Sequence, residues 1–198
     1  MSLPLEKVFG FPPFSANNAE KDGARSACDA MLALRDRIGF GTGHAMKDRQ
    51  KEWERIGALL REQSTLALAT VDEDGLASVA PLFYLVDEGL TLYWLSSEKS
   101  EHSRNVAREP RVAGTVYAEA DRWKQIRGVQ MRGVASTVTD PALRKKLIGE
   151  YCRRFHLGRV FQLVIRRSTL YALRPQFFRF IDNSSGFGAG FEWTRKLE

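Results

Sequence analysis

The residues best suited to chemistry lie in one short stretch, residues 92–112, with the sequence LYWLSSEKSEHSRNVAREPRV. It contains three serine hydroxyls close together, at Ser96, Ser97 and Ser100, followed by the imidazole of His102. Hydroxyls, free backbone N–H groups and the positive end of a helix are the groups that bind an anion such as a phosphate. The stretch is therefore a candidate anion site, and the simpler alternative is an ordinary capped helix on the surface.

Two elements must position these side chains. The apolar run from Leu92 to Leu95 predicts a strand. Ser96 or Ser97 then caps a helix over residues 98–108, with Glu98 in its first turn against the positive helix end. Pro110 disfavours helical geometry at the residue before it, so the helix is expected to end there. Taken alone, this strand and helix favour the simpler alternative.

A second unusual feature is Pro81, which interrupts the apolar segment 76–86. Segments 64–71 and 76–86, joined by the turn sequence DEDG, predict a β-hairpin. Proline lacks the N–H that a strand donates to its neighbour. We therefore expect a bulge, a sheet edge or a ligand at Pro81.

The remaining elements predict a small antiparallel barrel with helices on it, since strands with short turns dominate and no regular strand–helix alternation is present. Residues 157–167 fit a helix or a strand equally well. The expected strands are 90–95, 111–117, 126–139, and a closing hairpin of 169–173 with 177–181; the expected helices are 46–63 and 141–155.

We expect two domains: an N-terminal extension over residues 1–45 and a folded domain over residues 46–198. The extension combines a Pro- and Gly-rich arm with a short helix over 24–38. The glycines at 39, 41 and 43 follow this helix rather than a strand, so they indicate a linker rather than a dinucleotide-binding loop. The Gly-rich segment 181–198 is expected to be a tail.

Composition narrows the class of protein. The 198 residues are 43% hydrophobic, which supports a proper core. We expect a cytoplasmic protein, because no segment has the pattern of a membrane span or a secretory signal, and Cys28 and Cys152 suit reduced thiols. The net charge of +6 favours anionic partners. Basic residues are spread through 104–167 rather than clustered with aromatic residues, which disfavours nucleic acid.

The sequence has no motif of a hydrolase or of a nucleotide-binding loop. There is no G-x-S-x-G, no H-E-x-x-H and no P-loop. His44 and His156 are isolated, so no metal site is expected. If the protein is an enzyme, a cofactor must carry the chemistry.

Four segments in this order resemble the FMN-binding split-barrel proteins of the pyridoxamine 5′-phosphate oxidase-like superfamily, over roughly residues 48–190. The resemblance is to an uncharacterised branch of that superfamily, because of the ending FFRFIDNSSGFG. The four segments are LREQSTLALATVDEDGLASVAPLFY, LYWLSSEKSEHSRNVAREPRV, WKQIRGVQMRG and FFRFIDNSSGFG.

The resemblance implies a mainly β fold, a six-stranded antiparallel split β-barrel with flanking helices, forming a homodimer with FMN between the subunits. It implies that the isoalloxazine ring is edged by Ser78, Val79, Ala80 and Pro81. It also implies that the ribityl chain or phosphate meets Ser96 and Ser97, that the phosphate site is completed by Ser100 and His102, and that the partner's flavin is reached by Gln130.

Two positions leave alternatives open. His102 stands where many relatives place Lys or Arg, and a neutral imidazole carries less charge than either. Arg104, Arg111 or Arg132 are alternative cations for the phosphate. Trp123 has two equal interpretations, as a packing residue or as a flap over the flavin.

The function that follows from the resemblance is that of an FMN-dependent oxidoreductase acting on an unidentified small molecule. Pyridoxamine 5′-phosphate oxidase activity itself is disfavoured, because that enzyme's C-terminal Arg–His motif has no counterpart after His156. A haem-binding split-barrel protein is the next alternative. A non-catalytic module that binds RNA or another ligand on the basic surface is the hypothesis from a different class.

Overall fold

The computed structural model describes residues 42–158 and 161–195. The predicted arm and the helix over residues 24–38 lie outside the described residues, and the predicted boundary between residues 45 and 46 stays a prediction. The first described element is helix α2, Thr42–Glu62, which begins four residues before the predicted start at 46. Ile56, Leu59 and Leu60 lie on one face of this helix and are buried.

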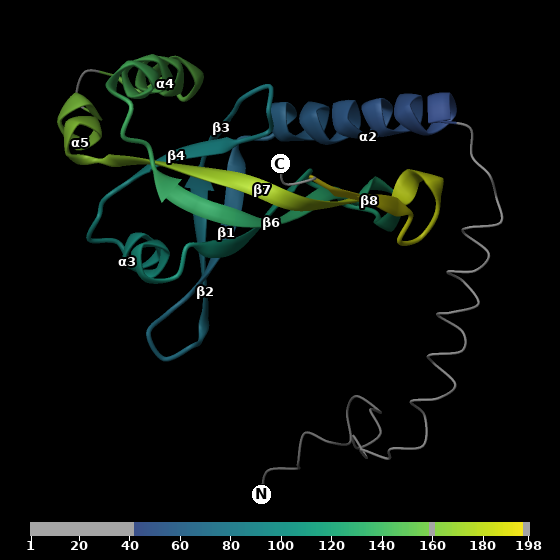
Figure 1. Ribbon diagram of the computed structural model, residues 1–198, viewed down its shortest axis with the longest axis horizontal. Helices are drawn as coiled ribbons and strands as arrows, with labels where there is room; N and C mark the ends of the chain where they lie inside the picture. The colour runs from purple at the N-terminus through teal and green to yellow at the C-terminus, as the bar shows by residue number, and fades with distance from the viewer. Residues whose placement is uncertain (1–41, 159–160, 196–198) are drawn as a thin grey trace, which may run out of the picture. The chain divides into compact units, whose positions relative to one another are not determined.

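One antiparallel sheet forms the centre of the fold (Figure 1). Its strands are joined in the order β2-β1-β5-β6-β7-β4-β3, and β8 pairs with β7. Strands β2 and β3 stand at opposite ends of this order, yet only Tyr84 separates them in the chain. The chain therefore passes from one edge of the sheet to the other, which curls the sheet into a split barrel. The strands are β1 (Thr65–Val71), β2 (Ala77–Phe83), β3 (Leu85–Val86), β4 (Leu92–Ser96), β5 (Arg111–Tyr117), β6 (Arg127–Thr137), β7 (Thr169–Asp182) and β8 (Gly190–Thr194).

The sheet has eight strands in the described residues, so the predicted six was wrong. The expected strand 76–86 is two strands, β2 and β3. Part of the predicted tail is a strand, β8, whose residues pair with Phe177–Ile181 of β7. The break at Tyr84 was missed because it lies inside a continuous apolar run. Strand β8 was missed because its alternation covers only about four residues at the end of a Gly-rich segment.

The predicted hairpin over residues 169–181 was also wrong, because β7 is one continuous strand of 14 residues. Pro175 lies inside it and suggested a turn. The structure instead places Pro175 where the β6–β7 register shifts, between Arg132 and Gly133. A bulge accommodates a residue that cannot donate an N–H. Gly133 fits closely there, since a Cβ on it would lie 2.2 Å from the carbonyl oxygen of Arg174.

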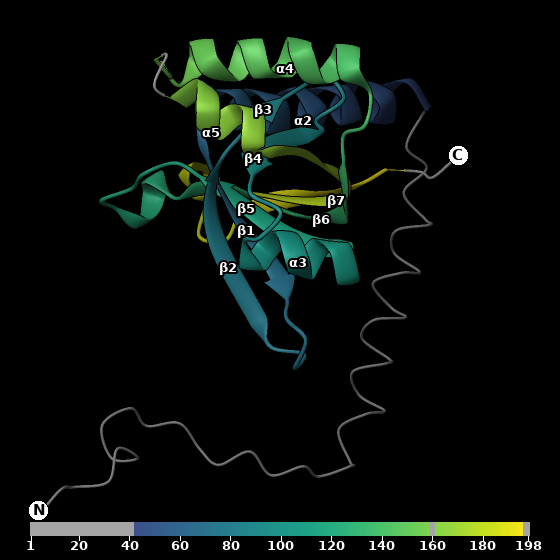
Figure 2. The same ribbon diagram turned by 90° about the vertical axis from the view of Figure 1, so that its left-hand side faces the viewer.

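Helices cover the sheet on two sides, with α4 (Pro141–Arg154) and α5 (Gln162–Arg167) on one side and α3 (Glu101–Arg108) on the other (Figures 1 and 2). Helix α4 begins as predicted, with Pro141 in its first turn and the Asp140 carboxylate accepting the backbone N–H groups of Ala142 and Leu143. The ambiguous segment 157–167 contains α5.

The main core fills the barrel and is lined by large apolar side chains, including the fully buried Trp94, Phe178 and Met131. A second cluster lies under α4, where Leu147 and Tyr151 pack on Tyr93 and Leu170. No helix within the described residues is both long and apolar enough to cross a membrane.

Candidate functional site

A serine–histidine cluster, consisting of Ser96, Ser100 and His102, lies where β4 ends and α3 begins. The Nε2 atom of His102 is 2.5 Å from the Ser96 Oγ and 3.1 Å from the Ser100 Oγ, and the two hydroxyl oxygens are 3.3 Å apart. All three residues are half-buried. Three of the predicted phosphate-site residues therefore converge on one point.

The hydrogen bonds around the cluster limit its protonation state. The Ser100 hydroxyl is 2.8 Å from the carbonyl oxygen of Ser97 and 2.8 Å from the Ser103 hydroxyl, so it is surrounded by acceptors. Burial lowers the pKa of His102, and the nearby Glu101 carboxylate opposes this only in part. A neutral imidazole with one donor and one acceptor nitrogen suits this environment.

The helix begins later than predicted, at Glu101, so the capping role assigned to Ser96 or Ser97 was wrong. Ser100 occupies the N-cap position, but its side chain makes no capping bond and turns to the cluster instead. Ser97 belongs to the preceding turn, where its hydroxyl accepts the backbone N–H of Lys99. Glu98 lies outside the helix and accepts a 2.7 Å hydrogen bond from the Thr169 hydroxyl.

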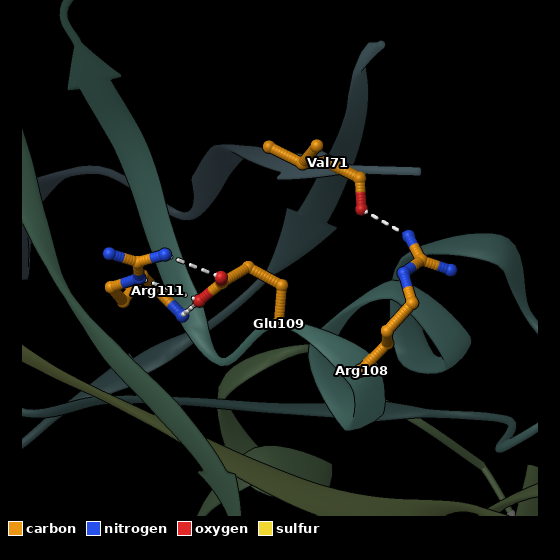
Figure 3. A network of polar contacts seen from close by, with 4 residues as sticks. All are labelled: Val71, Arg108, Glu109 and Arg111. Carbon is orange, nitrogen blue, oxygen red and sulfur yellow. Dashed lines mark hydrogen bonds and ion pairs between the residues drawn. The ribbon is translucent and has the colours of Figure 1, made fainter. Parts of the chain in front are cut away.

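Two contacts fix α3 to β1 and thereby hold the cluster in place. Asn105 is 3% exposed, and its side-chain amide donates a 3.0 Å hydrogen bond to the hydroxyl of Thr70, which is 2% exposed. Arg108 donates a 2.6 Å hydrogen bond to the carbonyl oxygen of Val71, drawn in Figure 3. Neither contact was predicted, although a polar Asn105 beside the apolar Val106 indicated a polar group on the buried face of the helix.

The structure also gives partners to the alternative cations. Arg111 forms a bidentate ion pair with Glu109, at 2.7 and 2.8 Å, which holds the pKa of that carboxyl near 2 (Figure 3). The Arg104 guanidinium donates to the carbonyl oxygen of Lys99. Arg132 lies over the ring of Phe177, 4.2 Å from its centroid. Among these candidates, His102 is the residue that the structure places against the serines.

The four predicted residues of β2 divide between two faces of the sheet. Ser78 and Ala80 are half-buried on the face toward α3, while Val79 and Pro81 point to the opposite, exposed face. Pro81 stands on an edge strand, which confirms one of the alternatives expected for it. An edge strand leaves one row of backbone N–H and C=O groups without a strand partner.

The exposed face of the sheet carries a groove of about 530 Å³. Val79 and Gln130 line it together, and Pro81 lines a smaller neighbouring hollow of about 280 Å³. The floor is made of small residues, Ala67, Ala69, Ala113 and Gly114. The predicted site residues are thus only partly brought together. One group is polar and consists of Ser96, Ser100 and His102, and the other, Val79, Pro81 and Gln130, lies along the exposed face, while Ser78, Ala80 and Ser97 belong to neither.

The sequence profile of the pyridoxamine 5′-phosphate oxidase family matches residues 53–181. The chain belongs to this family. Its split barrel is the fold that the resemblance implied, with more strands than expected. Membership assigns the fold and not the oxidase reaction.

The chain is similar in sequence to UPF0306 proteins and similar in structure to haem-related proteins, among others. The chain is 32% identical to the UPF0306 protein YhbP of Salmonella schwarzengrund over 144 residues, 71% of this chain and 91% of that protein. A haem-binding protein from Mycobacterium smegmatis has a similar structure, with a TM-score of 0.57, 22% identity, and coverage of 72% of this chain and 57% of that one. The haem storage protein HutZ from Vibrio cholerae gives a TM-score of 0.53 with 23% identity, covering 62% and 88%. At these identities the structural neighbours establish the fold alone.

Proposed function

We propose that the protein binds FMN at a homodimer interface and transfers a hydride or electrons to or from a small molecule. The observation that carries this proposal is the serine–histidine cluster, because it gathers hydroxyl and imidazole donors at the N-terminus of α3. A phosphate there would be held by Ser96, Ser100 and His102, assisted by the positive end of the helix.

The ring of the cofactor has a suitable surface on β2. This strand is an edge of the sheet, α3 packs against it, and Figure 2 shows the two side by side. Free backbone groups between Ser78 and Pro81 can hydrogen-bond to the polar edge of a flavin, and the small Ala80 permits close approach. FMN bound there would supply the redox chemistry, while the protein orients it and shapes the substrate site.

A second copy of the chain is proposed because the face of the sheet opposite α3 exposes large apolar side chains. Val79 is 64% exposed, Phe83 52% and Tyr117 64%. Gathered apolar side chains of this size are typical of surfaces that a partner covers. A partner on this face would also bring its own Gln130 near the groove.

The deciding experiment is a titration of the full-length protein with FMN, followed by quenching of flavin fluorescence and by the absorbance bands near ~370 and ~450 nm that report a bound flavin. Saturable quenching is expected. A colourless protein that quenches no FMN fluorescence would sink the proposal.

The position of the phosphate is tested separately by replacing His102. His102→Ala removes a hydrogen bond to a charged group and should weaken FMN binding by about tenfold or more. His102→Lys introduces the full cation that many relatives have at this position, and this variant should bind FMN more tightly than the wild type. The matched control is His156→Ala, an exposed histidine after the end of α4, which should leave the affinity unchanged. If His102→Ala binds as well as the wild type, the phosphate lies elsewhere.

Haem is the alternative occupant, because two proteins of similar fold bind or store it. The same preparation should therefore be titrated with haem. In this structure the Nε2 of His102 is engaged by two serine hydroxyls, which opposes its use as an iron ligand. A Soret band that His102→Ala abolishes, without flavin binding, would favour haem instead.

A further inference from the structure

Two loops at one end of the sheet hold aromatic side chains out into solvent. One loop contains the short 3₁₀ helix η2 (Trp123–Gln125) and the other contains η4 (Asn183–Ser185). Trp123 is 48% exposed and Phe187 is 86% exposed, and their ring centroids are 6.1 Å apart. Exposed aromatic residues gathered in this way are typical of binding surfaces.

Asn183 fixes the two loops to each other. It is 4% exposed; its side-chain amide donates a 2.9 Å hydrogen bond to the carbonyl of Trp123, and its side-chain oxygen accepts the backbone N–H of Gly188 at 2.9 Å. Its backbone N–H donates to the carbonyl of Ile126 at 3.0 Å. The two loops that carry the aromatic pair are therefore fixed by buried hydrogen bonds, while the Phe187 side chain stays almost wholly exposed.

Ile126, which follows η2 directly, lies in the wall of an apolar hollow of about 410 Å³, which we call the aromatic hollow after its Tyr117 ring. Tyr117, Ile126 and Ile181 line it, and Gly128 contributes to its floor. A Cβ at Gly128 would lie 3.2 Å from the Tyr117 Cβ and 3.3 Å from the carbonyl oxygen of Val116. The missing side chain keeps the floor open, so the hollow admits a flat group.

The hollow opens into a larger, acidic one of about 670 Å³, with which it shares Glu119 and Arg127. Arg127 is neutralised by an ion pair with Glu62 at 2.8 Å. Within residues 42–158 and 161–195, neither Glu119 nor Asp121 has a salt-bridge partner. Two unpaired carboxylates at the rim favour a positive charge on whatever binds.

The aromatic ring of Trp123 is itself a surface for cations. The Lys124 ammonium lies 5.5 Å from the centroid of that ring. Cations are attracted to the face of an indole, and a ligand cation would find the same attraction.

The hollow is continuous with the groove on the sheet, because Thr115 and Gln130 line both. A molecule in the hollow would therefore lie next to a cofactor placed along that groove. This continuity connects the hollow to the site already described.

We propose that the aromatic hollow binds a flat aromatic molecule carrying a positive charge, and that this is the substrate class of the protein. The second part rests on the proposed flavin function; the binding of the cation does not. The apolar walls and the glycine floor select for the ring, and Glu119 and Asp121 select for the charge. An anion of the same shape is disfavoured by those two carboxylates.

The test uses two probes of the same size, 1-naphthylmethylammonium and 1-naphthoate, titrated into the full-length protein by calorimetry at low ionic strength. The cation should bind saturably and the anion about tenfold more weakly. The Glu119→Gln, Asp121→Asn double variant should remove this preference. Equal affinity for both probes, or no binding of the cation, overturns the proposal.

Three further variants locate the binding. Tyr117→Ala should weaken binding of the cation by about fivefold, because Tyr117 is the aromatic side chain that lines the hollow. Gly128→Ala, which fills the floor, should weaken it similarly. The matched control is Phe161→Ala, a residue 50% exposed at the start of α5, which should leave binding unchanged. A fall in affinity as large in the control would show that binding is nonspecific, against the proposal.

Parallel titrations separate this proposal from the flavin function. Binding of the naphthyl cation without FMN binding would support the site and remove the flavoprotein. FMN binding without binding of the naphthyl cation would support the flavoprotein and overturn the proposed cation site.

Self-association should also be measured by sedimentation, since a second copy could cover the hollow. Weakened self-association in Tyr117→Ala, with no binding of the cation to the wild type, would assign the hollow to the dimer and overturn the proposal.

Discussion

The serine–histidine cluster and the aromatic hollow are built in opposite ways. The cluster takes its three side chains from seven consecutive residues, Ser96 to His102, and they are polar and half-buried. The hollow combines Tyr117 of β5, Gly128 of β6 and Ile181 of β7, which are far apart in the chain, and its Tyr117 ring is exposed. The loops beside it are joined by the bond from Asn183 to Trp123. One site is therefore encoded locally and depends on the placement of a helix, while the other exists only once the sheet has formed.

The two sites therefore depend on different buried side-chain amides. Asn105 holds the helix that carries the cluster, and Asn183 holds the loops that carry the aromatic pair. Each is a polar side chain in an otherwise apolar setting, whose hydrogen bonds must be satisfied. If the comparison is right, replacing one amide should impair one site and leave the other.

The largest effect is expected for Asn105→Ala. The substitution leaves the buried Thr70 hydroxyl without its partner and should lower the free energy of unfolding by about 1–3 kcal/mol. FMN affinity should fall with it, because α3 is no longer fixed to β1, whereas binding of the naphthyl cation should persist. Chemical denaturation and the two titrations measure these effects. Arg104→Ala, an exposed change on the same helix, is the control and should shift stability by less than about 0.5 kcal/mol. An unchanged FMN affinity in Asn105→Ala would mean that the hydrogen bond from Asn105 to Thr70 does not position the cluster.

A smaller effect is expected for Asn183→Ala. Its bonds join two surface loops rather than the core, so the unfolding free energy should fall by about 1 kcal/mol. The backbone N–H of Gly188 should exchange with solvent faster, and binding of the naphthyl cation should weaken while FMN affinity holds. Amide hydrogen exchange detects the change directly. The control is Ser185→Ala, an exposed neighbour in η4. Equal protection of Gly188 in both proteins would show that Asn183 does not fix the loops.

The contrast also explains what the sequence could predict. Ser96, Ser100 and His102 do lie together, as the resemblance implied, because a strand followed by a short helix brings them close. Ser97, expected with them, lies in the turn instead, and the phosphate role of all four stays a prediction. The predicted end of the helix before Pro110 was also confirmed, since α3 ends at Arg108. This boundary is local as well, because a proline restricts the residue before it. Gln130 and Val79 line one groove within a single chain, whereas the resemblance implied that Gln130 reaches the partner's flavin, and that role stays a prediction.

The failures have a common physical cause, which is pairing between distant segments. Pro175 suggests a turn in isolation, and only the bulge opposite Gly133 allows β7 to continue through it. The strand at Gly190–Thr194 exists because β7 offers it an edge. Trp123 was left between packing and a flap because its neighbour Phe187 lies in another loop. Local propensity contains no information about such partners.

The smallest expected effect concerns pH and belongs to the cluster alone. Burial lowers the pKa of His102 in the folded protein below the ordinary value near 6.5 that it has in the unfolded chain. The unfolded chain therefore binds the proton more readily, so the free energy of unfolding should fall as the pH drops through about 6.5 and level off below the folded pKa. His102→Gln keeps a hydrogen-bonding side chain but does not titrate, so its stability should decline less between pH 7 and pH 5. Urea denaturation of both proteins across that range measures the difference, and the other two histidines cancel because both proteins contain them. Parallel curves would show that His102 is not desolvated as its contacts with Ser96 and Ser100 indicate, and the cluster would then be as open to solvent as the aromatic hollow.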